Sequence, residues 1–159
     1  MKKILLLLAA MFAFGFQSVN AQDAIKIVTG HPDFKMKVSR CEASGKNVVL
    51  DLTVTNVGDT DIPQFQVSGG SHFTKFYDDQ GNIYEGGRFI KVKIANKEYT
   101  NEFQEIKLVS GVTYKLSYII TDVSPQAETF ALVEPFVKCA SWSITKDTVK
   151  LRNIPITRN

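Results

Sequence analysis

The chain has 159 residues, a formal net charge of +3, 44% hydrophobic residues, 22% charged residues and two cysteines. This length fits a single domain, and the balance of charge and hydrophobicity excludes an intrinsically disordered chain. Two cysteines are too few for a disulfide-dense miniprotein or a four-cysteine zinc site.

Residues 1–21 have the pattern of a secretory signal peptide. Lys2 and Lys3 give a positively charged start, residues 4–16 form an apolar run, and a small-residue cleavage site ends at Ala21. The alternative, a transmembrane anchor, needs about 20 apolar residues, and polar residues interrupt the run before that length. No cysteine stands at the cleavage point to accept a lipid. The sequence therefore predicts a chain exported to the periplasm or the exterior, neither membrane-spanning nor lipidated.

Removal of the signal peptide changes the charge that a partner would meet. Lys2 and Lys3 carry two of the three net positive charges, so the exported chain is close to neutral. Lys91, Lys93 and Lys97 are the nearest approach to a basic cluster, and alternate spacing of this kind is typical of the solvent face of a strand. Because nucleic-acid binding requires a clustered basic patch, no nucleic-acid partner is predicted.

Apolar and polar residues alternate in several runs, which is typical of antiparallel strands with one buried face. The intervening residues, such as Asp51 and Thr53, are expected on the solvent side. No long run with helical periodicity follows the signal peptide. The apolar positions are, in chain order, Phe34, Met36 and Val38; Val48, Leu50, Leu52 and Val54; Ile90, Val92 and Ile94; Ile106 and Leu108; Val112, Tyr114, Leu116, Tyr118 and Ile120; Phe130 and Leu132; and Val149 and Leu151.

Turn-forming residues separate these runs, and most breaks are spaced by about 8–12 residues, as in sandwiches and barrels. The pattern predicts an all-β fold, a two-sheet antiparallel immunoglobulin-like sandwich of seven to eight strands, over residues 34–159. Residues 22–33 are predicted to be an N-terminal extension. Residues 140–147 fit no strand pattern and are predicted to be a long loop or an edge excursion. The turns are expected at 44–47, 57–61, 68–71, 78–82, 86–87, 110–111 and 124–125.

Four stretches carry a resemblance to a known family. They are residues 48–58 (VVLDLTVTNVG), 77–84 (YDDQGNIY), 108–112 (LVSGV) and 149–156 (VKLRNIPI). Together they resemble secreted, Bacteroides-type bacterial immunoglobulin-like β-sandwich domains of unknown function, which are similar in fold to the mycobacterial immunoprotective extracellular protein. The resemblance spans residues 35–156 and implies a fold and an exported location. It brings no catalytic residue with it.

Cys41 and Cys139 are predicted to form a disulfide, because an exported protein folds in an oxidising compartment. Such a bridge would contribute about 2–4 kcal/mol to stability. The alternative is a pair of buried free thiols, since separation along the chain says nothing about separation in space.

Residues with possible chemistry are few. Residues 68–72 bring Ser, Gly and His together, but they lack the G-x-S-x-G order of a nucleophile elbow and are predicted to be a loop between strands. His31 and His72 are isolated, which disfavours a zinc site. The spacing within residues 78–82 does not match a calcium-binding loop. Close carboxylate pairs serve glycoside hydrolases but are also ordinary turn residues, and they occur at Asp59/Asp61, Asp78/Asp79 and Glu102/Glu105.

Aromatic residues crowd the middle third of the chain, where they can fill a core or form a contact surface. We expect most of them in the core. Trp142 is different, because it lies between two serines in a segment whose pattern does not demand burial, and it is the best single candidate for contact with a partner. The crowded set comprises Phe65, Phe73, Phe76, Tyr77, Tyr84, Phe89, Tyr99 and Phe103.

The sequence therefore predicts an exported, non-catalytic interaction or ligand-binding module of the bacterial cell envelope or exterior. Its partner would be a protein or a carbohydrate. No catalytic residue, cofactor or metal is predicted. The alternative is a small secreted hydrolase that uses loop carboxylates, and fold alone does not decide between the two.

Overall fold

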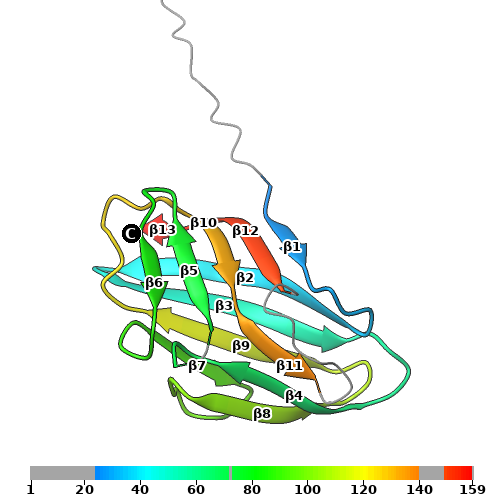
Figure 1. Ribbon diagram of the computed structural model, residues 1–159. Helices are drawn as coiled ribbons and strands as arrows, with labels where there is room; N and C mark the ends of the chain where they lie inside the picture. The colour runs from blue at the N-terminus through cyan, green and yellow to red at the C-terminus, as the bar shows by residue number, and fades with distance from the viewer. Residues whose placement is uncertain (1–23, 72, 140–148, 159) are drawn as a thin grey trace, which may run out of the picture.

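The computed structural model describes residues 24–71, 73–139 and 149–158 (Figure 1). The predicted signal peptide, His72 and Trp142 lie outside these ranges. All regular structure in the described residues is β-strand, so the predicted all-β class is confirmed. No helix capable of crossing a membrane occurs in the described part of the chain.

One sheet, here called the β3 sheet, contains the longest strands and has the order β13-β2-β3-β9-β7 (Figure 1). Neighbouring strands are antiparallel except for β13, which runs parallel to β2. Its strands are β2 (Phe34–Ser44), β3 (Asn47–Asn56), β7 (Ile90–Ile94), β9 (Thr113–Ile120) and β13 (Thr157–Arg158).

Two further sheets lie next to each other and face the β3 sheet. The chain passes from one to the other at the buried Pro135, and again between the end of β4 at Ser68 and the start of β5 at Lys75. The β10 sheet, in the order β1-β12-β10-β5-β6, contains β1 (Lys26–Val28), β5 (Lys75–Asp78), β6 (Ile83–Glu85), β10 (Thr129–Glu134) and β12 (Lys150–Pro155). The β4 sheet, in the order β11-β4-β8, contains β4 (Ile62–Ser68), β8 (Phe103–Leu108) and β11 (Phe136–Cys139).

The predicted seven-to-eight-strand, two-sheet immunoglobulin-like arrangement is wrong, because the described residues form 13 strands in three sheets. Pro135 separates β10 from β11, since proline cannot donate a hydrogen bond to the sheet ladder. The strands β1, β6 and β13 have only two or three residues, too few to show alternation. β1 lies within the segment predicted as an N-terminal extension and pairs with β12.

The predicted alternation is confirmed along the long strands. Val48, Leu50, Leu52 and Val54 of β3 are fully buried, as are the apolar positions of β7. One core joins the three sheets. At its centre Phe76 packs edge-on against Tyr118 and Phe130, with ring centroids 5.7 and 5.1 Å away.

Strand β10 departs from the predicted alternation. The register between β10 and β5 shifts between Phe130 and Leu132. A bulge of this kind adds one residue to one strand and moves the following side chains to the other face. Val133 is therefore fully buried, while Leu132 is only half-buried.

Candidate functional site

Three phenylalanines gather on the outer face of the β4 sheet. Phe136, Ser68 and Phe103 are direct partners across β11, β4 and β8, so their side chains share one face. Phe73, from the loop before β5, stacks on Phe136 with centroids 6.3 Å apart, and Phe103 meets the same ring edge-on at 5.2 Å. Phe73 is 55% and Phe103 45% exposed, whereas Phe136 beneath them is 6% exposed. We call these three residues the aromatic cluster.

The loop that carries Phe73 is tightly held rather than loose. A Cβ on Gly70 would stand 1.9 Å from the carbonyl oxygen of Gly86, and one on Gly69 would stand 2.8 Å from the Cα of Asn101. Thr74 donates from Oγ1 to the Ser68 carbonyl at 2.7 Å. Gly69 and Gly70 are therefore required because other backbone segments pass too close to admit a side chain. The sequence alone does not show this contact.

We expect Gly70→Ala to destabilise the protein by about 1–3 kcal/mol, because backbone must move to admit the new methyl group. Gly45→Ala is an informative control, since its Cβ would meet nothing within 4 Å although its φ is +59°. Chemical denaturation of both variants checks this, and a smaller loss for Gly70→Ala than for Gly45→Ala would contradict the packing argument.

Phe73 also has an unusual backbone conformation. Its φ of 54° lies in the left-handed region, which is rare for a bulky residue and costs of order 1–3 kcal/mol. Between the two sheet phenylalanines, the hydroxyl of Ser68 is buried and finds no hydrogen-bond partner in the described part of the chain. The fold thus holds an aromatic side chain exposed at a local cost.

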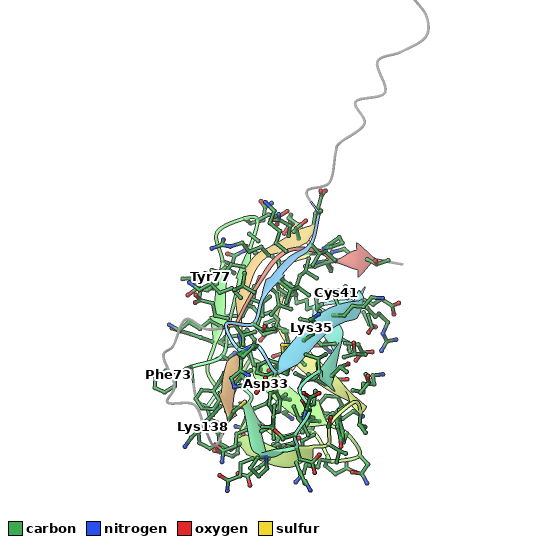
Figure 2. The ribbon with its side chains drawn as sticks, turned by 90° about the vertical axis from the view of Figure 1, so that its right-hand side faces the viewer. Asp33, Lys35, Cys41, Phe73, Tyr77 and Lys138 are labelled. Carbon is green, nitrogen blue, oxygen red and sulfur yellow. The ribbon has the colours of Figure 1, made fainter. Side chains whose placement is uncertain are left out.

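A polar row borders the aromatic cluster on the same face. Lys138, Gln66 and Glu105 are direct partners across β11, β4 and β8, one pleat away from Phe136. Gln66 donates to Glu105 at 2.5 Å. Figure 2 shows Phe73 and Lys138 on the same side of the molecule. The face therefore combines an apolar centre with a charged margin.

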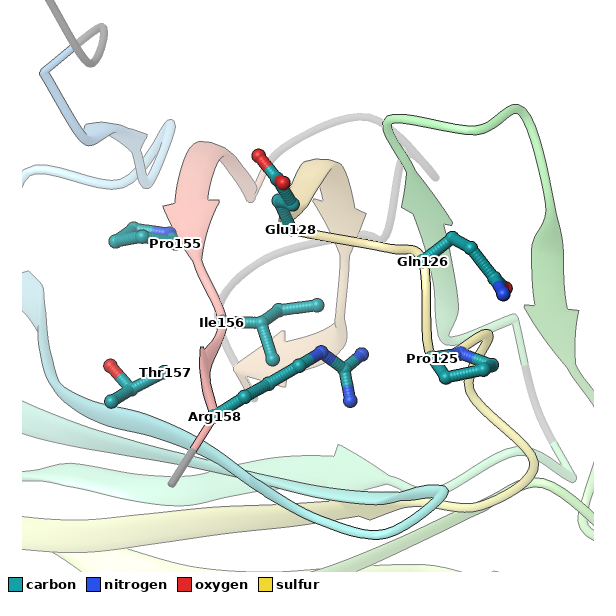
Figure 3. A pocket seen from close by; sticks show the side chains of 7 residues that line it. All are labelled: Pro125, Gln126, Glu128, Pro155, Ile156, Thr157 and Arg158. Atoms are coloured by element: carbon teal, nitrogen blue, oxygen red, sulfur yellow. The ribbon is translucent and has the colours of Figure 1, made fainter. Parts of the chain in front are cut away.

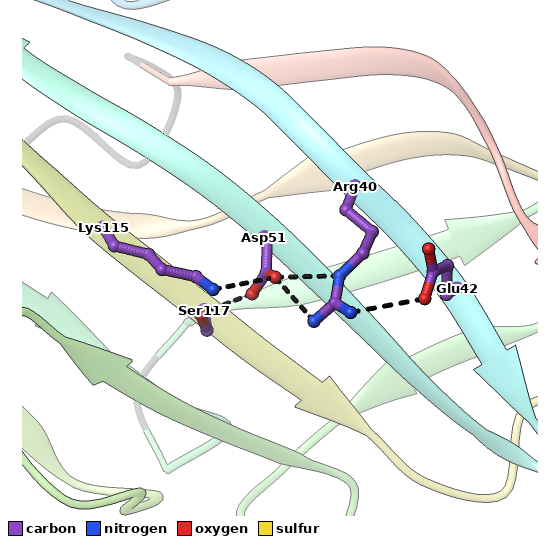
Figure 4. A network of polar contacts seen from close by, with 5 residues as sticks. All are labelled: Arg40, Glu42, Asp51, Lys115 and Ser117. Carbon is purple, nitrogen blue, oxygen red and sulfur yellow. Dashed lines mark hydrogen bonds and ion pairs between the residues drawn. The ribbon is translucent and has the colours of Figure 1, made fainter.

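Asp51 organises a second polar site, on the outer face of the β3 sheet (Figure 4). Its carboxylate accepts hydrogen bonds from Arg40 Nε at 2.9 Å and Ser117 Oγ at 2.5 Å, and it pairs with Lys115 Nζ at 3.2 Å. Arg40 also pairs with Glu42 at 3.3 Å. Asp51 was expected on the solvent side. It does lie opposite the core, but the side chains above it leave only 5% of its own side chain exposed.

Burial by itself would raise the pKa of Asp51. Hydrogen bonds from Ser117, Lys115 and Arg40 more than offset that effect and hold the pKa below its usual value. Asp51 is therefore ionised at neutral pH, and its carboxylate positions the side chains of Arg40 and Lys115.

The predicted disulfide between Cys41 and Cys139 is wrong, because both residues are buried free thiols. Cys41 pairs with Leu50 in the β3 sheet, and Cys139 with Phe65 in the β4 sheet. Burial and the charge of Asp33, which lies just before β2, raise the pKa of Cys139, so Asp33 is near that thiol. Cys41 lies eight residues further along the chain, or roughly 25 Å in an extended strand. A disulfide needs Cα atoms about 4.4–6.8 Å apart. An oxidising compartment permits a bridge but does not bring thiols together.

We expect both cysteines to resist alkylation in the folded protein. Burial raises the pKa of each thiol to about 12, so the reactive thiolate does not form at neutral pH. Burial also keeps the alkylating reagent away from the sulfur atoms. After denaturation without reductant, intact-mass spectrometry should find two alkylated cysteines. If no alkylated cysteine were found after denaturation, Cys41 and Cys139 would have to be joined by a disulfide.

Most carboxylates of the three predicted pairs form structural hydrogen bonds or ion pairs, each with its own partners. Asp61 accepts from Ser110 N at 2.9 Å and pairs with Lys107 at 2.6 Å. Asp78 is buried and accepts from Tyr84 and from Asn82 of its own hairpin. Three of the other four members also accept hydrogen bonds: Asp79 from the backbone of Glu128, Glu105 from Gln66, and Glu102 from Ser71 Oγ.

The pKa values of Asp61 and Asp78 also disfavour acid catalysis by these two carboxylates. Hydrogen bonds lower the pKa of Asp61, and they outweigh burial to lower the pKa of Asp78. A general acid needs the opposite shift. Among the described residues, no group of three His, Cys, Asp or Glu side chains could hold a metal ion.

A hollow of about 510 Å³ lies beside the C-terminal strand (Figure 3). Its cation, Arg158, donates to the carbonyl oxygens of Ser124 at 2.8 Å and Ala127 at 3.0 Å. Arg158 therefore anchors β13 to the loop between β9 and β10. The lining residues are Pro125, Gln126, Glu128, Pro155, Ile156, Thr157 and Arg158.

The aromatic cluster joins residues from three separate segments of the sequence. Phe73 and Phe103 belong to the aromatic set expected mostly in the core, yet both are exposed, and Phe136 is not identified from the sequence. The only sequence hint is that both exposed residues follow turn-forming or polar neighbours. The contact candidate Trp142 lies outside the described residues.

No family model matches the sequence, and no curated protein matches it significantly. Among solved structures, the chain is similar to the CBM3a-L domain with flanking linkers from scaffoldin cipA of the cellulosome of Clostridium thermocellum. The two are 15% identical, the match covers 79% of this chain and 88% of that chain, and the TM-score is 0.29. A likeness of this size carries no argument about function, and no family is assigned.

Proposed function

We propose that the protein is an exported, non-catalytic binding module that holds a protein partner on the aromatic cluster. One observation carries this proposal: the fold keeps Phe73 exposed, in a left-handed backbone conformation, stacked on Phe136. Aromatic residues are enriched in the centres of protein interfaces and supply much of their binding energy. Residues 1–21 support export.

The makeup of the face favours a protein partner over a carbohydrate. The two exposed rings, Phe73 and Phe103, are phenyl groups and offer apolar surface without a polar tip, and the Ser68 hydroxyl beside them is buried. Lys138 and Glu105 lie at the margin instead. An apolar centre with a charged margin is the usual anatomy of a protein interface. The non-catalytic part of the proposal is supported by the carboxylates, five of which accept hydrogen bonds from separate partners: Asp61, Asp78, Asp79, Glu102 and Glu105.

The test compares a Phe73→Gly/Phe103→Ala variant with the wild type. We expect the affinity for a partner isolated from the exported fraction, and then purified, to fall at least about tenfold. Glycine adopts positive φ without steric cost, so stability should stay within about 1 kcal/mol at position 73. Partner binding is measured by calorimetry and stability by denaturation.

Ile83→Ala is the matched control, because Ile83 is also 55% exposed but lies on β6, in the β10 sheet. Equal losses in the control and the double variant would overturn the proposed interface. So would a glycan that binds the wild type and loses binding in the double variant, which would assign the cluster to a carbohydrate.

A further inference from the structure

The outer face of the β3 sheet concentrates positive charge. Register places the row Lys93, Ser117, Asp51 and Arg40 across β7, β9, β3 and β2, and the next row contains Lys115, Thr53 and Lys37. Lys35 and Lys91 extend the same face at its two ends. In strands β2, β3, β7 and β9 this face carries six cations and two carboxylates: the cations are Lys35, Lys37, Arg40, Lys91, Lys93 and Lys115, and the carboxylates are Glu42 and Asp51.

Part of the positive charge on this face is not neutralised by ion pairs. On the other sheets several cations do pair with acids, as in Lys75–Glu85 at 2.5 Å and Lys107–Asp61 at 2.6 Å. On the β3 sheet the two carboxylates are already engaged by Arg40 and Lys115. Within the described residues, Lys35, Lys37 and Lys91 make no ion pair, so their charge is available to a ligand.

Hydroxyl groups lie between these cations. Thr53 is the direct partner of both Lys37 and Lys115, whose Cα atoms are therefore about 10 Å apart across three strands. One pleat further, Thr55 and Thr113 share a hydrogen bond of 2.7 Å beside Lys35. A polymer on this face would meet alternating cations and hydroxyls.

We propose that this face binds a linear acidic polysaccharide, independently of the aromatic cluster. Lysines can pair with its carboxylate or sulfate groups, and the threonine hydroxyls can hydrogen-bond its sugar hydroxyls. The array is extended and shallow, as a chain-like ligand requires. A local hollow of about 360 Å³ beside Arg40 and Glu42 adds a place for a side group.

Two other polyanions fit this face less well. Insertion into a membrane surface needs exposed apolar side chains, and none of the large exposed ones in the described residues lies in β2, β3, β7 or β9. Single-stranded nucleic acid needs aromatic platforms for its bases. The nearby Tyr99 already lies against Lys93, whose Nζ is 4.7 Å from the ring centroid.

The experiment titrates the exported chain with polygalacturonate, which carries carboxylates, and with chondroitin sulfate, which also carries sulfates. Dextran is the neutral comparison. We expect binding to at least one acidic polymer, weakened by salt, and at least about fivefold weaker in Lys35→Gln/Lys37→Gln. Lys26→Gln/Arg152→Gln is the matched control, because it removes the same charge from an exposed pair on β1 and β12.

Each outcome decides the proposal. The proposal is supported if Lys35→Gln/Lys37→Gln loses binding to the acidic polymer and Lys26→Gln/Arg152→Gln keeps it, with both variants unfolding at the wild-type temperature. Equal losses in both variants, or no binding to either acidic polymer, overturn it. Tighter binding to phosphatidylglycerol vesicles or to DNA than to either polysaccharide also overturns it. Because Phe73 and Phe103 are untouched, failure here leaves the proposed protein interface unaffected.

Discussion

Leu52→Ala is expected to destabilise the protein by about 2–5 kcal/mol, through lost apolar burial and the cavity left behind. Leu52 is fully buried at the centre of β3, and its direct partners are Val38 on β2 and Leu116 on β9. Thr53, the next residue, points to the outer face between Lys37 and Lys115. Thr53→Ala should therefore stay within about 1 kcal/mol.

Urea denaturation of the two variants, compared with the wild type, measures both effects. The pair is informative because the residues adjoin in sequence and differ mainly in the face of the sheet that they occupy. Equal losses at Leu52 and Thr53 would contradict the orientation of β3. A loss confined to Thr53 would mean that the register of β3 is shifted by one residue.

The long strands could be predicted because their burial is encoded locally. Residues 34–44, 47–56 and 113–120 alternate in sequence, and each strand has one face on the core. Strand β10 could not be predicted in the same way. Its bulge between Phe130 and Leu132 arises from pairing with β5, more than 50 residues earlier in the chain, and leaves no local signal.

Sites that depend on distant contacts were missed for the same reason. The loop that carries Phe73 is packed by the close approach of Gly70 to Gly86, and Asp51 is covered by Arg40 and Lys115 on neighbouring strands. The expected oxidising compartment suggested a disulfide, but the fold leaves Cys41 and Cys139 as separate buried thiols. The basic face is likewise a product of register, since its lysines come from separate segments.

Asp51→Asn is the second large effect, with an expected loss of about 2–4 kcal/mol. The carboxylate accepts from Arg40 and Ser117 and pairs with Lys115, and only 5% of its side chain is exposed. A neutral amide would leave two cations facing each other across β3. The loss should lie toward the lower part of the range usual for a buried pair, because both cations reach solvent and can be rehydrated.

Asp122→Asn is the matched control, since Asp122 lies 4.0 Å from Arg88 in a pair that is exposed on both sides. Surface pairs of this kind contribute about 0–1 kcal/mol. Denaturation at neutral pH should therefore separate the two substitutions clearly. A similar loss at both positions would show that Asp51 is not the anchor of the network.

The difference between wild type and Asp51→Asn should also depend on pH. The pKa of Asp51 in the folded protein is below the ordinary value of 3.8, so the unfolded chain takes up its proton first as the pH falls. The stability contributed by the carboxylate is complete above that ordinary pKa and disappears as the pH falls through the folded value. Denaturation between about pH 7 and pH 2 should thus show the two unfolding free energies converging below about pH 4. A difference that stays constant through this range would mean that the cost of the substitution comes from shape or packing rather than from the charge of Asp51.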